Sequence, residues 1–113
     1  DDVYSAKTFA ELGFVDKALA KIGLIETPQQ IRERRIKERI AAIDYWNNRV
    51  QTRRSQWESH LRDAFDRNLR EIDQAVFEYT EILEKNPQDD LSGEMLDSAL
   101  NEKMELLREF SEM

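Results

Sequence analysis

Apolar residues recur at seven-residue intervals through the middle of the chain, inside a run that contains neither Gly nor Pro. Fifty-eight residues separate Pro28 from Pro87 without either of these breakers of regular structure. The run predicts one very long helix, or two helices joined without a normal turn, and we place it over residues 28–85. A continuous helix of that length would span roughly 85 Å at about 1.5 Å per residue, more than one small domain can bury. The spacing favours a coiled coil. The two heptad lines are Ile36, Ile43, Val50, Trp57 and Ala64, and Ile40, Asn47, Arg54, Leu61, Asn68, Ala75 and Ile82.

A shorter amphipathic segment precedes this run. Apolar residues at spacings of three to six predict a helix over residues 2–22, and Gly23 is suited to the left-handed conformation that ends a helix. The start of the long run is also marked. Thr27 and Gln30 have the spacing of a capping box, and Pro28 stands where its missing N–H is not needed.

Another amphipathic segment follows. Pro87 disfavours helical geometry at Asn86 and so ends the long run, after which Asp89 or Ser92 caps a helix over residues 90–111. A short connection makes the last helix antiparallel to residues 60–85. The predicted fold is therefore all-α: an extended, coiled-coil-like three-helix hairpin with one long central helix, in a single domain over residues 1–113.

The net charge of −7 is divided unevenly along the chain. Residues 1–27 carry five acids and three bases, residues 28–70 six acids and eleven bases, and residues 71–113 thirteen acids and three bases. A basic middle beside an acidic end is expected to attract a partner or a second copy. We therefore expect a homodimer, with other protein partners also open.

Few residues suggest chemistry. The chain has no Cys and one His, His60, without the converging ligands of a metal site, and no Gly-rich phosphate loop or nucleophile constellation. We expect no catalytic residue, metal or cofactor, and hence no enzyme. Acidic Glu33 and Glu38 interrupt the basic stretch 32–39, so nucleic-acid binding is not expected.

Large aromatic residues in the poorly covered basic half suggest an interface instead. Trp46 and Trp57 are eleven residues apart, three helical turns, and so share one face of the predicted long helix. Aromatic anchors are typical of protein interfaces, although packing under the first helix explains them equally well. The candidate interface residues are Trp46, Val50, Trp57, Leu61 and Phe65.

Residues 65–113 carry the pattern Leu69-x-x-Ile72-Asp73-x-Ala75-Val76, Leu83-x-x-Asn86-Pro87, then Leu96 and Lys103-x-x-x-Leu107. This pattern resembles the extracytoplasmic region of transmembrane anti-sigma factors. In that family a long helix ends in an Asn-Pro turn and a second helix returns along it. The resemblance implies a sensing or scaffolding piece of a membrane-anchored transcription regulator, located in the periplasm or otherwise outside the cytoplasm. It places sigma-factor binding in a part not present here, and the chain's start at Asp1 agrees with an excised fragment.

Two other classes stay open. Thr27-Pro28-Gln29-Gln30 resembles the Leu-Thr-x-x-Gln motif of small periplasmic stress chaperones, with Glu26 in place of the leucine, and helix capping explains the same residues. A coiled-coil adaptor or nucleic-acid binder is the remaining alternative. Suppression of aggregation would favour the chaperone, and salt-sensitive binding to DNA or RNA would favour the nucleic-acid binder.

Overall fold

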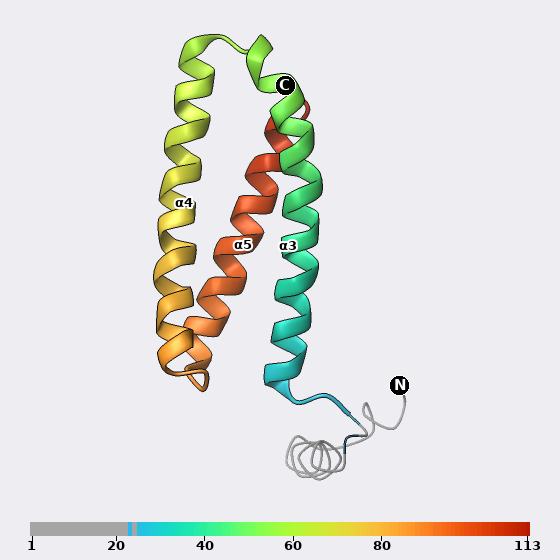
Figure 1. Ribbon diagram of the computed structural model, residues 1–113, viewed down its shortest axis with the longest axis vertical. Helices are drawn as coiled ribbons and strands as arrows, with labels where there is room; N and C mark the ends of the chain where they lie inside the picture. Colours follow the sequence, from blue (N-terminus) through green and yellow to red (C-terminus); the bar gives the residue numbers. More distant parts are fainter. Residues whose placement is uncertain (1–22, 24) are drawn as a thin grey trace, which may run out of the picture. The chain divides into compact units, whose positions relative to one another are not determined.

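The described part of the chain is all-α, as the sequence predicts. The computed structural model describes residue 23 and residues 25–113, so the helix predicted over residues 2–22 lies outside the described residues. The elements are α3 (Pro28–Arg53), the short 3-10 helix η1 (Arg54–Gln56), α4 (Ser59–Lys85) and α5 (Asp90–Phe110) (Figure 1). Contacts divide the chain into two units, residues 1–31 and 32–113. The single domain over residues 1–113 stays a prediction.

The start of α3 is built as its sequence predicts. The amide of Gln30 donates to Thr27 Oγ1 (3.1 Å), and the amide of Thr27 donates to Gln30 Oε1 (2.8 Å). This reciprocal pair is a capping box. Gly23 has a φ of 78°, the left-handed conformation expected of it.

The predicted helix over residues 28–85 is divided in two. It is continuous through Asn47 and Asn48 but ends at Arg53, and α4 starts at Ser59. Trp57 and Glu58 have extended backbone, with ψ of 152° in both. The prediction of one continuous helix is therefore wrong, and the alternative of two helices without a Gly or Pro turn holds. Residues 54–58, here named the α3–α4 corner, bend because of contacts made by side chains elsewhere in the fold.

The connection between α4 and α5 follows its local sequence. The helix stops at Lys85, before Pro87, and the side chain of Asp89 accepts a hydrogen bond from the Ser92 amide (3.0 Å). Helices α4 and α5 then run antiparallel and in close contact. In Figure 1 the last helix lies between α4 and α3, with its C-terminal end near the α3–α4 corner.

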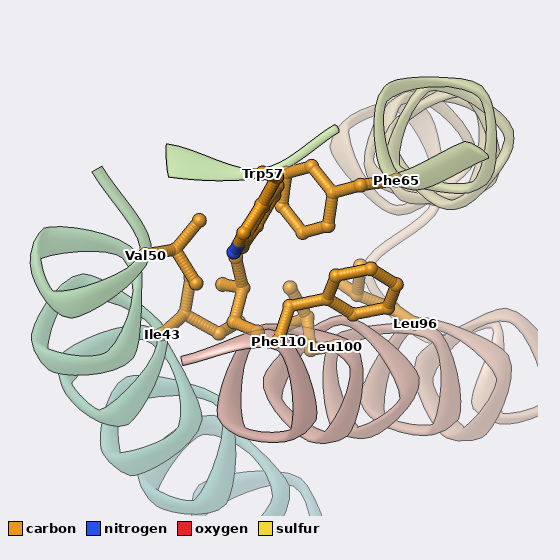
Figure 2. Packing of buried hydrophobic residues seen from close by; sticks show 8 residues of the cluster. Ile43, Val50, Trp57, Phe65, Leu96, Leu100 and Phe110 are labelled. Atoms are coloured by element: carbon orange, nitrogen blue, oxygen red, sulfur yellow. The ribbon is translucent and has the colours of Figure 1, made fainter. Parts of the chain in front are cut away.

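Most of one heptad line points into the core of residues 32–113, whereas of the other line Leu61 packs against the core and both isoleucines are exposed. Ile43, Val50 and Trp57 of the first line are buried, whereas Ile40 and Ile82 of the second are 49% and 40% exposed. The bend at the corner separates the two halves of the second line, so one seven-residue repeat cannot face a single seam. The buried apolar cluster is Ile43, Val50, Trp57, Phe65, Leu96, Leu100, Leu107 and Phe110 (Figure 2).

Candidate interaction surfaces

Three of the five predicted interface residues lie in the core. Val50 and Phe65 are fully buried and Trp57 is 5% exposed, in contact with residues of the same chain. Trp46 and Leu61 are partly buried at the edge of the cluster. Intrachain packing thus accounts for Val50, Trp57 and Phe65 without a partner. A single straight helix over residues 28–85 would leave its basic half without a covering helix. That prediction places all five residues at an interface.

An aromatic cluster holds the α3–α4 corner. The ring of Trp57 lies edge-on to those of Phe65 and Phe110, each at a centroid distance of 5.4 Å, and the two phenylalanine rings are 5.0 Å apart. Figure 2 shows the indole between Val50 of α3 and Phe65 of α4, with Phe110 of α5 beside it. No described residue accepts a hydrogen bond from the buried Trp57 Nε1. The side chain of Trp57, from the corner, therefore lies beside residues of all three helices, α3, α4 and α5.

Two arginines satisfy the polar groups of the same corner. Arg62 Nη1 donates to the carbonyl oxygens of Trp57 (2.6 Å), Arg54 (3.2 Å) and Ser55 (3.4 Å). The Arg54 guanidinium donates to both carboxylate oxygens of Asp66, at 2.9 and 3.0 Å. These hydrogen bonds hold the pKa of Asp66 below its ordinary value and raise that of Arg54. Backbone carbonyls left free by the end of the helix are thus satisfied from the next helix.

A ladder of ion pairs joins α3 to α5. Arg39 Nε donates to Asp97 Oδ1 and Arg39 Nη1 to Asn101 Oδ1, both at 2.7 Å. Arg32 pairs with Asp90 at 3.4 Å, and in both pairs the partners are 58 residues apart. The two helices therefore run parallel in register. The charge pattern predicted that this basic stretch attracts a partner or a second copy, and its Arg32 and Arg39 are paired within the chain.

Gly93 provides the closest approach in this ladder. The Arg32 side chain is buried against it, and a Cβ built at Gly93 would lie 2.8 Å from Arg32 Cδ and closer still to Nε and Cζ. Any larger residue at this position would displace Arg32. The missing side chain of Gly93 therefore gives the guanidinium its place on α5.

A shallow groove runs along the opposite side of α5, against α4. Its volume is about 400 Å³, its partly buried apolar residues are Ile72 and Leu106, and its polar lining includes two asparagines and four glutamates. Only one of these glutamates, Glu105, has an ion pair, with Arg108, in the part of the chain that the structure describes. The sequence carried a signal for this groove, because three of the acids follow helical spacing beside Leu106. The glutamates are Glu71, Glu102, Glu105 and Glu109.

Other candidates are less developed. His60 is exposed and lies 3.3 Å from Glu58, and no three potential metal ligands gather among residues 23 and 25–113. Tyr45 is 55% exposed, and the Arg49 guanidinium lies 5.9 Å from its ring centroid. No described helix is both long and apolar enough to cross a membrane.

Comparisons with known proteins add no relative. Models of protein families, curated proteins and solved structures all yielded no match to this chain. Functional conclusions therefore depend on the residues and their arrangement.

Proposed function

We propose that this chain is a non-enzymatic protein-interaction domain that scaffolds or senses within a membrane-bound anti-sigma-type regulator. The observation that carries the interaction role is the groove between α4 and α5. Its partly buried Ile72 and Leu106 offer apolar contact, and the glutamates beside them offer charge. A helix with an apolar stripe flanked by Lys or Arg complements both features, which is a common mode of peptide recognition.

The acidic rim contributes selectivity more than affinity. Glu71, Glu102 and Glu109 make no ion pair with another described residue, so their charge is available to a partner. Complementary charge speeds association and disfavours acidic partners. The net charge of −10 over residues 71–113 extends the same preference beyond the groove.

An amphipathic Leu/Lys helical peptide tests the groove by fluorescence anisotropy with the full chain. The double variant Glu102→Gln/Glu109→Gln is expected to weaken binding about 3- to 10-fold, at the value of exposed charge pairs. Glu81→Gln/Glu84→Gln removes the same charge from α4 outside the groove lining and serves as the matched control. If both double variants weakened binding equally, net charge alone would explain the effect. That result would contradict binding in the groove.

The regulatory setting depends on the resemblance of residues 65–113 and has its own test. The gene region upstream of this segment should encode a membrane helix and a Cys/His zinc pattern. A fusion of the full protein to a periplasmic reporter enzyme should be active outside the cytoplasm. Absence of both upstream features would remove the anti-sigma setting and leave the groove proposal standing.

A further inference from the structure

The α3–α4 corner lacks the local features that normally end one helix and start another. Its five residues include no Gly or Pro, Glu58 makes no side-chain capping hydrogen bond at the start of α4, and Arg53 makes none before η1. Other helix starts in the described chain are capped, at Thr27 and at Asp89. Local sequence therefore permits a helix to run through residues 54–58.

A straight helix through the corner would gain its own interactions. Arg54, Glu58 and Arg62 stand four residues apart, so the carboxylate of Glu58 would lie between two guanidinium groups on one helix face. Backbone groups now exposed by the end of α3 would become intrahelical. The bent form keeps instead the Arg62 bonds to three carbonyls and the Arg54–Asp66 pair.

The contacts of α3 do not require that α3 and α5 belong to one chain. The ladder from Arg32 to Arg39 and the packing of Ile43 and Val50 are made with residues far along the sequence. A second copy presents the same acidic and apolar surface on its own α5. If the corner straightens, residues 32–53 leave their own hairpin and can occupy that surface with their contacts to α5 retained.

We propose that two copies of the chain exchange α3: residues 28–85 of each become one continuous helix, and residues 32–53 of one copy pack on α5 of the other. The two long helices then cross antiparallel at residues 54–58, with the two Trp57 side chains near the two-fold axis. The surface of α5 that binds α3 is thus occupied by α3 of a second copy. Exchange requires no particular function of the α4–α5 groove.

Single-cysteine variants test the exchange directly, because the chain contains no native Cys. Arg35 and Glu94 form an exposed ion pair between α3 and α5, 3.6 Å apart. Full-length Arg35→Cys and Glu94→Cys chains are mixed at about 100 µM, a concentration at which a useful interface is populated, and treated with a short bis-maleimide. A cross-linked species of twice the 13.4 kDa chain mass is expected only if α3 of one copy lies on α5 of another. Lys37→Cys mixed with Glu94→Cys is the control, since Lys37 is exposed and, unlike Arg35, forms no ion pair with α5.

Glu58→Pro distinguishes exchange from ordinary association. Glu58 has φ −65°, the preceding Trp57 is extended, and no described residue accepts a hydrogen bond from the Glu58 amide. Proline fits this bent corner but breaks a continuous helix, so the cross-linked yield should fall at least about tenfold. Glu58→Ala, which removes the carboxylate alone, should keep most of the yield.

Arg62→Ala should act in the opposite direction. It removes three hydrogen bonds from the bent corner and only one exposed pair, Glu58 with Arg62, from the straight helix. The straight form is therefore favoured and the yield should rise several-fold, whereas Arg67→Ala on the same helix should not raise it. Circular dichroism establishes that each variant is folded. Monomeric mass for both the unaltered chain and Arg62→Ala would overturn the proposal, as would a cross-linked yield unchanged by Glu58→Pro.

Discussion

The chain turns twice between its described helices, and the two turns are stabilised in different ways. Between α4 and α5 the residues of the turn itself direct the change: Pro87 follows the helix end and Asp89 caps the next start. At the α3–α4 corner the stabilising groups come from a distance, from Arg62, Asp66 and the rings packed on Trp57. A turn can therefore be specified by local sequence or by the fold that it joins.

The largest expected effect comes from the residue that ties the corner to the core. Trp57→Ala should lower the free energy of unfolding by about 3–5 kcal/mol, the cost of deleting a large buried aromatic side chain. Pro87→Ala at the other turn should cost less than about 1 kcal/mol, because Asp89 still caps α5. Urea unfolding followed by circular dichroism measures both. Similar costs at the two turns would contradict the distinction between them.

The same difference explains what the sequence predicts and what it does not. The caps at Thr27 and Asp89 and the stop before Pro87 all depend on residues within four positions. The cap at Thr27 and the stop were predicted correctly, and Asp89 is one of the two caps that the sequence offered. The bend at residues 54–58 depends on the carboxylate of Asp66, twelve residues after Arg54, and on the ring of Phe110. Sequence patterns report local preference, and here the preference is for continued helix.

The candidate surfaces follow the same rule. Burial of Val50, Trp57 and Phe65 follows from the bend, so a straight-helix interpretation assigned these residues to an interface. The pairing of the basic stretch with α5 depends on a parallel alignment across 58 residues, which composition does not reveal. The acids beside Leu106 were visible as a pattern, but their groove needs α4 beside them.

A smaller effect is expected at Arg62. Arg62→Ala should destabilise the monomer by about 1.5–3 kcal/mol, the range for hydrogen bonds to charged groups. The corner carbonyls lose their donor in this variant, whereas Arg67→Ala leaves every described contact in place. Thermal unfolding at a concentration low enough to keep the chain monomeric measures both variants. Equal stability of the two variants would mean that the hydrogen bonds of Arg62 do not stabilise the corner.

The cap of α5 should contribute less to the free energy of unfolding than Arg62 does. Asp89→Ala is expected to cost about 1 kcal/mol, because the Ser92 amide loses its acceptor. Asp89→Asn keeps an oxygen acceptor at the same position and should recover most of the loss. Chemical unfolding of the two variants measures the difference, and an equal loss in both would attribute the effect to charge instead of capping.

The smallest effect is a dependence on pH at the corner. Because the Asp66 pKa is lowered in the folded chain, the Arg54–Asp66 pair contributes fully above the ordinary unfolded value of about 3.9 and is lost as the pH falls through the lowered folded value. Titration of the Asp66 carboxyl by NMR should show the low pKa. Arg54→Gln should return the pKa toward its ordinary value, and a titration unchanged by this substitution would contradict the pair.

The bend itself can be measured as a distance between spin labels on α3 and α4. Asp44 lies about one turn beyond Arg39, which contacts Asn101, and Gln74 is next to Asp73, which pairs with Lys103, so the two positions are at similar levels along α5. Electron–electron double resonance is measured on the spin-labelled variant Asp44→Cys/Gln74→Cys, diluted with unlabelled chain at low concentration. The distance between the two labels should be about 20–30 Å, two interhelix spacings plus the length of the labels. A single distance near 45 Å, the length of thirty helical residues, would mean that the monomer is straight and would contradict the tertiary corner.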